Sequence, residues 1–376
     1  MREVVQALFD DAPPEGAPVS AQPVDEGLRR LCVRLPRTMR FGTSTWNFPG
    51  WRGIVWSRGS GLDHLATEGL PAYSASPLFR TVGLDRNFYR ALSEEEFASF
   101  AHQVPEDFRF IVKAPREVTD PVLRSERGVP AALNPKFLNP TATMERFIEP
   151  VRQGLGVRTG PLVFQFSPFP HNVLRTLDSR ILLIERIGAY FEALHAALEN
   201  IPSAERPVLA AEFRNYELVT PRMMRRLRET GVRPVVGLHP AMPGIRRLTD
   251  AIRCCDAPDT MGMIDGRLTG LPEANATWRL TGPLVVRWSL AAHQFYDTAR
   301  RDWAPFDAIR AVDPATRALI ASLVARAARS QVESFVAVNN KAEGCAPLTV
   351  RGIAEITDRI LEADRTAGAS VSPVRK

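Results

Sequence analysis

Cysteine is scarce in this chain, and its scarcity bears on both stabilisation and location. The 376 residues include four cysteines, Cys32, Cys254, Cys255 and Cys345. They are irregularly placed, and the adjacent pair lacks the spacing of a structural zinc site. These features exclude a disulfide-rich secreted scaffold and predict free thiols in a reducing compartment. We therefore expect a cytoplasmic protein.

Long apolar runs and common cofactor motifs are also missing. No segment is apolar over the length of a bilayer, and the first residues lack the apolar core of a signal peptide, so no membrane partner is expected. Neither a G-x-G-x-x-G after the first strand-like segment nor a P-loop is present, which weighs against dinucleotide and nucleotide enzymes. The absence of G-x-S-x-G weighs against a Ser-His-Asp hydrolase. The cofactor is unknown, and the sequence requires none.

Histidine is rare as well. The chain has six histidines, and none lies in an H-x-H or H-E-x-x-H motif. Asp85, Glu212 and His239 could in principle meet as a set of oxygen and nitrogen ligands. Only His239 among the histidines follows a predicted strand, however, so we predict no metal site.

The charge of the chain is positive. The net charge is +6, without a block of consecutive lysines or arginines. Such a balance is compatible with a phosphorylated ligand or with nucleic acid. It is equally typical of an arginine-rich protein with solvated charged faces. We predict a small anionic ligand, with nucleic acid as an open alternative; the sequence leaves the oligomeric state unknown.

The two ends of the chain differ in composition from its middle. Residues 10–27 are rich in proline, alanine and acidic residues, which is typical of flexible chain. The last ten residues are mainly small and polar. We predict a flexible leader at 1–36, one folded domain at 37–366 and a disordered tail at 367–376.

Between these ends, short apolar segments alternate with stretches of helical periodicity. Several of the apolar segments show little alternation, as expected for strands of a parallel sheet covered by helices. The eight predicted strands are 40–45 (RFGTST), 81–85 (TVGLD), 108–113 (FRFIVK), 161–166 (PLVFQF), 207–213 (PVLAAEF), 234–239 (PVVGLH), 283–288 (PLVVRW) and 334–339 (SFVAVN).

Four of the intervening segments carry clear helix signals, at 93–103, 181–198, 220–230 and 314–330. Ser93 and Glu96 have the spacing of a capping box. Pro221 and Gly231 stand just inside the start and just past the end of the third helix. Eight strand–helix units predict an α/β protein with a single-domain (β/α)8 TIM barrel. A doubly wound open sheet is the alternative.

Polar side chains stand at the C-terminal ends of nearly all the predicted strands. Barrel enzymes keep their active sites at this end, so the residues are candidates for one concave site. In strand order they are Thr43, Ser44 and Trp46; Asp85; Lys113; Gln165; Glu212 and Arg214; His239; Arg287; and Asn339 and Asn340. The alternative is a structural ion-pair network across the end of the barrel.

The chemistry of these side chains suggests roles. Glu212 is the candidate general acid or base, because burial at a strand end could shift its pKa toward neutrality. Lys113 and Asp85 are the other catalytic candidates, and the remaining residues are predicted to bind substrate. Arginine binds carboxylate and phosphate groups in a bidentate manner. The alternative role of Glu212 is to neutralise an arginine.

Six segments in order resemble the family called domain of unknown function 72. They are FGTSTWNFPGWRG, FRTVGLDRNFYR, FIVKAPREVTD, LVFQFSPFP, AAEFRNYE and FVAVNNKAEGCA, between residues 40 and 361. The resemblance implies a TIM barrel but no reaction. It implies that Lys113, Gln165, Glu212, Arg214, Asn339 and Asn340 occupy motif positions, with Arg287 in a further block.

The chain also departs from the family pattern. Gly83 stands where the family usually has glutamate, and Asp120 and Trp288 each replace a histidine. These departures allow two functional hypotheses. The first is an enzyme acting by acid–base chemistry, with hydrolysis as one class, on a phosphorylated or polyhydroxylated substrate. The second is a protein that binds an anionic ligand or nucleic acid with altered or lost activity.

Overall fold

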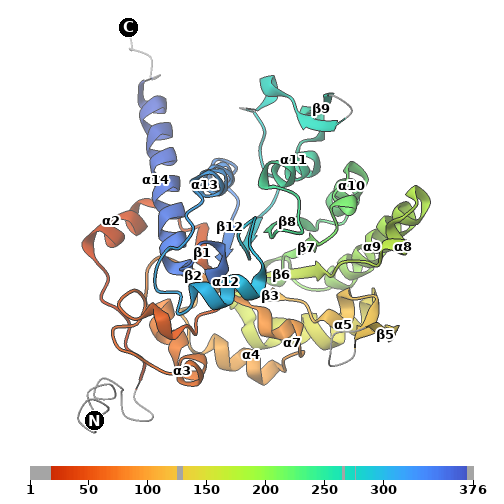
Figure 1. Ribbon diagram of the computed structural model, residues 1–376. Helices are drawn as coiled ribbons and strands as arrows, with labels where there is room; N and C mark the ends of the chain where they lie inside the picture. The colour runs from red at the N-terminus through yellow and green to blue at the C-terminus, as the bar shows by residue number, and fades with distance from the viewer. Residues whose placement is uncertain (1–17, 125–129, 265–266, 276, 371–376) are drawn as a thin grey trace.

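The protein is seen here in a computed structural model that describes residues 18–124, 130–264, 267–275 and 277–370 (Figure 1). The first part of the predicted leader and the end of the predicted tail lie outside these residues. Within the predicted leader, Glu26–Arg34 form helix α2, whose N-terminus is capped by Asp25 accepting from the Leu28 N–H at 2.8 Å. The prediction of flexible chain is therefore wrong for this stretch, because a capped helix occupies it.

The centre of the molecule is a closed barrel of parallel strands. Around the barrel the order is β1, β2, β3, β6, β7, β8, β11 and β12, and β12 pairs with β1. This closure confirms the predicted TIM barrel and excludes the open sheet. The strands are β1 (Met39–Thr43), β2 (Phe79–Leu84), β3 (Arg109–Lys113), β6 (Thr159–Phe166), β7 (Leu209–Phe213), β8 (Arg233–Leu238), β11 (Leu284–Trp288) and β12 (Ser334–Val338).

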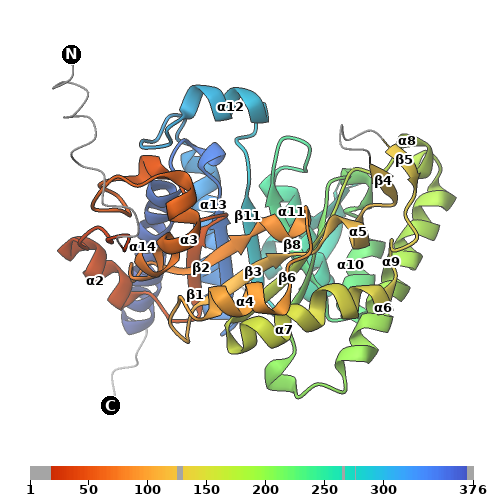
Figure 2. The same ribbon diagram turned by 90° about the horizontal axis from the view of Figure 1, so that it is seen from below.

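Helices surround the barrel in Figures 1 and 2. The four predicted helices are present as α4, α9, α10 and α13, and Ser93 and Glu96 form the predicted capping box. The helices after α2 are α3 (Leu62–Ser74), α4 (Glu94–Ala101), α5 (Arg116–Thr119), α6 (Pro140–Thr143), α7 (Glu149–Leu155), α8 (His171–Leu174), α9 (Leu177–Leu198), α10 (Pro221–Glu229), α11 (Ile245–Asp256), α12 (Tyr296–Trp303), α13 (Pro314–Arg329) and α14 (Ala346–Ser370). The last helix includes residues 367–370 of the predicted disordered tail.

Two antiparallel hairpins interrupt the strand–helix alternation. The first pairs β4 (Val122–Arg124) with β5 (Pro130–Leu133), and the second pairs β9 (Met261–Ile264) with β10 (Arg267–Gly270). Neither was predicted from the sequence. Each is an insertion between barrel strands, so the barrel closes without them.

The barrel interior is filled by apolar side chains that point inward from the strands. They are Ile111, Val163, Ala210, Val235, Val285, Phe335 and Ala337, all buried. A larger apolar core lies between the strands and the surrounding helices. Among the helices of the described residues, none combines the length and the apolar character needed to span a bilayer.

Candidate active site at the barrel mouth

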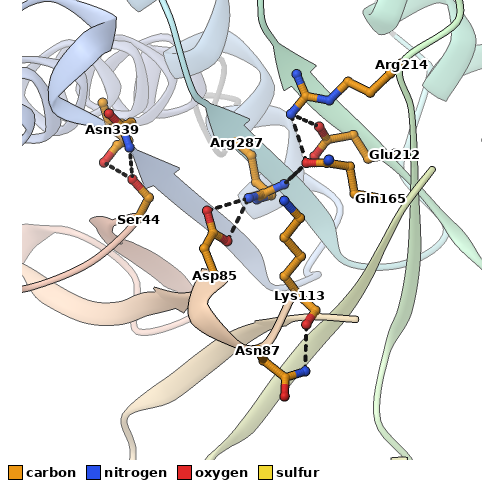
Figure 3. A network of polar contacts seen from close by, with 10 residues as sticks. Ser44, Asp85, Asn87, Lys113, Gln165, Glu212, Arg214, Arg287 and Asn339 are labelled. Carbon is orange, nitrogen blue, oxygen red and sulfur yellow. Dashed lines mark hydrogen bonds and ion pairs between the residues drawn. The ribbon is translucent and has the colours of Figure 1, made fainter. Parts of the chain in front are cut away.

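A polar layer lies directly above the apolar interior, at the end of the barrel where the strands finish; we call this end the barrel mouth. Side chains alternate along a strand, so the residue two positions after an inward-pointing one also points inward. On β3, β6, β7 and β11, the residues two positions past the apolar layer are Lys113, Gln165, Glu212 and Arg287. Figure 3 shows these four side chains converging. The structure thus brings these four predicted residues together, and their role toward a substrate stays a prediction.

Arg287 is the centre of the layer. One terminal nitrogen, Nη1, lies 2.5 Å from Glu212 Oε2. The other, Nη2, donates to both carboxylate oxygens of Asp85, at 2.8 and 3.0 Å. Asp85 begins the short helical turn η2 (Asp85–Phe88) that follows β2. The guanidinium therefore ties β11 to β7 on one side and to the end of β2 on the other.

Arg214, just past the end of β7, pairs with the second oxygen of Glu212. Its Nη2 lies 2.8 Å from Glu212 Oε1 and donates to Gln165 Oε1 at 2.9 Å. Arg287 Nη1 also donates to that amide oxygen, at 3.5 Å. Because the Gln165 oxygen accepts from two arginines, its NH₂ group is fixed as the donor that a ligand can use.

The Glu212 side chain is fully buried, and it is ionised near neutral pH. Burial alone would raise its pKa, but the charges of Arg214, Arg287 and Lys113 outweigh burial and lower the pKa to about 2. The sequence prediction of a pKa shifted toward neutrality is therefore wrong, because it did not foresee two arginines on one carboxylate. A carboxylate with this pKa is a poor proton acceptor near neutral pH. It instead holds Arg287 and Arg214 in place.

Lys113 differs from its neighbours because its ammonium has no ion-pair partner among the described residues. The residue is buried, with a relative exposure of 7%. Its Nζ lies 3.7 Å from the centre of the Phe88 ring, and Figure 3 shows it directed toward Arg287 and Gln165. Burial lowers the pKa of Lys113 to about 8, although Asp85 and Glu212 act in the opposite direction.

Asn87 fixes the backbone beneath this lysine. Its amide nitrogen donates to the Lys113 carbonyl oxygen at 2.8 Å, and its own oxygen accepts from the Leu92 N–H at 2.9 Å. Both bonds are buried. The turn that carries Asp85 is thereby attached to the end of β3, which keeps Asp85 and Lys113 on the same side of the mouth.

A second buried lysine, Lys341, was not among the predicted site residues. It lies in the turn η9 (Asn340–Ala342), directly after β12. Its Nζ is 4.4 Å from the centre of the Tyr296 ring on α12, which lies across one side of the mouth in Figure 2. Burial and the charge of Arg300 lower the pKa of Lys341 to about 8, against the effect of Asp85. The sequence signal was its position, directly after two predicted site residues.

His239 follows β8 and is half-buried at the mouth. Its Nδ1 accepts a hydrogen bond from the Ala241 N–H at 3.1 Å, so the neutral ring carries its proton on Nε2. Burial and then the charge of Arg214 lower the pKa of His239. The neutral imidazole is thus a hydrogen-bond donor rather than a cation.

Ser44 and Asn339 lie beside the layer, directly after the neighbouring strands β1 and β12. The Asn339 amide nitrogen donates to Ser44 Oγ at 2.8 Å, and its oxygen accepts from the Lys341 N–H at 3.0 Å. Both side chains are partly exposed. They are placed as predicted, and their contact with a ligand stays a prediction.

Three predicted binding residues are not brought to this layer. Thr43 donates to the Thr45 carbonyl oxygen at 2.7 Å and contacts Tyr73 behind the barrel wall. Trp46 is buried, with its indole nitrogen donating to the Leu65 carbonyl oxygen at 3.1 Å. The oxygen of Asn340 accepts from Trp51 at 3.2 Å. All three stabilise the packing of the barrel and its loops. Position at a strand end does not by itself tell whether a side chain points into the mouth or into this packing.

The three departures from the family pattern have different surroundings. Gly83 points inward, and a Cβ added there would lie 2.9 Å from the Ser44 carbonyl oxygen. Asp120 is buried, and its side chain accepts from the Val122 N–H at 3.2 Å at the start of β4. Trp288 belongs to the core between strands and helices, not to the barrel mouth.

Metal binding was considered for Asp85, Glu212 and His239. Over the described ranges, no group of three or more histidine, cysteine or acidic side chains is arranged to hold a metal ion. Both carboxylates instead bind Arg287. The arrangement present is a charge network rather than a ligand shell.

Comparison with known proteins places this barrel in a family. The family model described as "Protein of unknown function DUF72" matches residues 40–369. No curated protein matches the chain. A crystal structure of a DUF72 family protein from Enterococcus faecalis V583 is similar with a TM-score of 0.50 and 15% identity, covering 85% of this chain and 95% of that one.

Two other solved structures were found in the same comparison. A DUF72 family protein from Thermotoga maritima MSB8 gives a TM-score of 0.49 at 19% identity, over 86% of this chain and 99% of its own. A glycoside hydrolase family 5 enzyme from Prevotella bryantii B14 gives 0.29 at 8% identity, over 87% and 97%. Likeness at these levels does not bear on the reaction.

Proposed function

The chain belongs to the DUF72 family, and on that premise we propose that it is an enzyme that binds a small anionic substrate at the barrel mouth and transfers a proton through Lys113. The observation that carries the proposal is the Lys113 ammonium, which has no ion-pair partner among the described residues although the arginines of the same layer are paired. Arg287 and Arg214 are balanced by Glu212 and Asp85. The charge of Lys113 therefore remains uncompensated.

An anionic ligand would supply the missing partner. A buried ammonium without a counter-ion is costly, and a carboxylate or phosphate beside it would offset that cost. The Gln165 NH₂ group is a second donor on the same side. Arg287 and Arg214 hold the oxygen of that amide, so the donor direction is set before the ligand arrives.

Lys113 also suits proton transfer better than Glu212 does. Proton-transfer groups work best when their pKa lies near the working pH, and the pKa of Lys113 is about 8. Asp85, whose side chain is 37% exposed, is the carboxylate of the layer that solvent and substrate can reach. In this proposal Glu212 is a positioning residue, and hydrolysis stays one possible reaction class.

A thermal-shift panel tests the binding part of the proposal. Small phosphate esters, sugar acids and keto acids would be added to the wild-type protein and to Lys113→Met. We expect at least one compound to raise the Tm of the wild type, since a ligand at a hundred times its Kd contributes about 2.7 kcal/mol. Lys113→Met should lose that shift.

The matched control is Lys136→Met. Lys136 pairs with Glu117 at 2.8 Å, outside the polar layer, and removing it should leave the ligand shift unchanged. Loss of the shift in both variants, or in neither, would contradict the role of Lys113. A ligand that binds but is not turned over would favour the binding-protein alternative.

Nucleic acid as a partner stays a prediction. Many surface arginines are already paired, as Arg226 is with Glu185, Glu192 and Glu229. If nucleic acid binds, affinity for labelled DNA or RNA should fall steeply between low and moderate salt. No retardation at low salt would remove this alternative.

A further inference from the structure

Lysine is almost absent from the chain. Of its 48 basic residues counted as lysine or arginine, four are lysine: Lys113, Lys136, Lys341 and Lys376. Arginine supplies the positive charge nearly everywhere else, including the buried ion pairs of the barrel. Lysine is therefore the exception among the cations of this protein.

Two of the four lysines are the buried residues of the barrel mouth. Lys113 is 7% exposed and Lys341 is 6% exposed. Neither forms an ion pair in the part of the chain that the structure describes. Lys136 lies outside the mouth and pairs with Glu117 at 2.8 Å, and Lys376 lies outside the described residues.

The difference between the two cations is chemical. An arginine guanidinium does not lose its proton in a protein, whereas a desolvated lysine can become a neutral amine and act as a nucleophile toward carbonyl carbon. Lys113 has the surroundings for this role: it is buried, it has no ion pair within the described residues, and the donor group of Gln165 lies on the same layer.

Lys341 is the less suitable of the two. Its nitrogen faces two rings, those of Tyr296 at 4.4 Å and Phe306 at 5.8 Å. It also stands outside the inward-pointing strand positions that hold Arg287 and Gln165. Because its position is at the edge of the mouth, in the turn after β12, Lys341 lies outside the layer that holds the Gln165 donor group.

We propose that Lys113 forms an imine with its substrate, and that the substrate is a small aldehyde or ketone carrying a carboxylate or phosphate group. The inference rests on the proposed function for the anionic part of the substrate. Beyond that function, the inference specifies a carbonyl group in the substrate. It also assigns the Lys113 amine a covalent role in place of proton transfer.

The step balances without a redox partner. The neutral Nζ of Lys113 adds to the carbonyl carbon, a C–N bond forms, and the carbonyl oxygen takes up a proton. The nitrogen loses a proton, and the hydroxyl group of this carbinolamine then leaves as water after taking up a second proton. The product is a protonated imine plus one water molecule. We assign the exchange of these protons to Asp85, the carboxylate of the layer whose side chain is 37% exposed.

Reductive trapping tests the proposal on the full-length protein. The protein would be incubated with pyruvate or dihydroxyacetone phosphate and sodium cyanoborohydride, digested with trypsin and analysed by mass spectrometry. Cleavage after Arg109 and Arg116 gives the peptide FIVKAPR, in which Lys113 is the single lysine. Lactate, which has no ketone or aldehyde, is the matched reagent control.

We expect a reduced adduct on Lys113, at least about tenfold above that on Lys136, because the lower pKa gives far more neutral amine at the same pH. Lys113→Arg keeps the charge and should abolish the adduct, with circular dichroism used to check its folding. Equal labelling of all lysines, or labelling concentrated on Lys341, would overturn the proposal.

The outcome separates this inference from the proposed function. An adduct absent with both carbonyl probes, in a protein that still shows a Lys113-dependent thermal shift, would overturn the imine and leave anion binding intact. Loss of the thermal shift alone, with the adduct still formed on Lys113, would count against the proposed anion recognition and support the covalent chemistry.

Discussion

The two ends of the barrel both carry buried arginines and carboxylates, but these charges differ in how completely they are paired. At the end where the strands begin, Arg233 binds both oxygens of Asp256, at 2.6 and 2.8 Å. Its Nε donates to the Pro283 carbonyl oxygen at 2.9 Å, and Asp256 also accepts from Thr281 at 2.8 Å. Both charges are buried, and both are fully used by protein partners.

At the mouth, some buried charged groups have hydrogen-bonding or ion-pairing capacity that the described residues do not use. Arg287 is fully paired, but Glu212 Oε1 and Arg214 Nε are buried without a hydrogen bond, and Lys113 has no ion-pair partner among the described residues. A structure selected for stability alone would not gain from such groups, because each one costs free energy. The pair at the first end therefore stabilises the barrel, whereas the mouth keeps hydrogen-bonding capacity that the proposed ligand would use.

The largest expected effect compares one carboxylate from each end. Asp256→Asn and Glu212→Gln should each lower the free energy of unfolding by about 3–5 kcal/mol, because each leaves a buried arginine without its counter-ion. Urea unfolding measures this loss. Only Glu212→Gln should also weaken ligand binding. A loss of binding in Asp256→Asn at a temperature where it is folded would break the comparison.

A change of opposite sign is expected at Lys113. Its pKa of about 8 lies below the ordinary value of 10.5, so the folded protein bears a penalty at neutral pH that Lys113→Met removes. We expect this variant to be more stable by about 3 kcal/mol. Lys136→Met, at a surface ion pair, should change stability by less than about 1 kcal/mol. Destabilisation by Lys113→Met would show that the lysine is held by interactions beyond those described.

The smallest expected effect is the pH dependence of that stability difference. Between the folded pKa of about 8 and the unfolded value of 10.5, the unfolded chain binds more protons, so wild-type stability rises with pH. The advantage of Lys113→Met is complete below pH 8 and should shrink by about 1.4 kcal/mol per pH unit within this window. Urea unfolding of both proteins at several pH values measures the trend. A gap independent of pH would mean that the pKa of Lys113 is not depressed.

The barrel could be predicted from the sequence because its strands are short apolar segments that depend little on distant residues. All eight predicted segments contain strands, and the polar residues after them lie at one end as the fold requires. The pairing within the layer could not be predicted. The number of arginines that contact Glu212 depends on how β7 and β11 are placed around the closed barrel. A local sequence pattern does not determine that placement.

Other errors have local causes. Helix α2 was missed because its nine residues include four charged ones and follow a proline-rich stretch. Thr43 and Trp46 were predicted to bind because they stand at a strand end, yet their side chains point behind the barrel wall. Lys341 was missed, although the rarity of lysine in this chain would have drawn attention to it.

Gly237 constrains the order in which mutations can accumulate in this barrel. It lies on β8 beside Glu212, and a Cβ at this position would meet Glu212 Cδ at 2.9 Å and Cγ at 3.0 Å. The carboxylate cannot move aside freely, because two arginines hold it. Positions 212 and 237 are therefore epistatic. A side chain at position 237 becomes acceptable only after the glutamate at 212 has been shortened. If Gly237 is substituted first, the charge network is lost before another arrangement of charges can take its place.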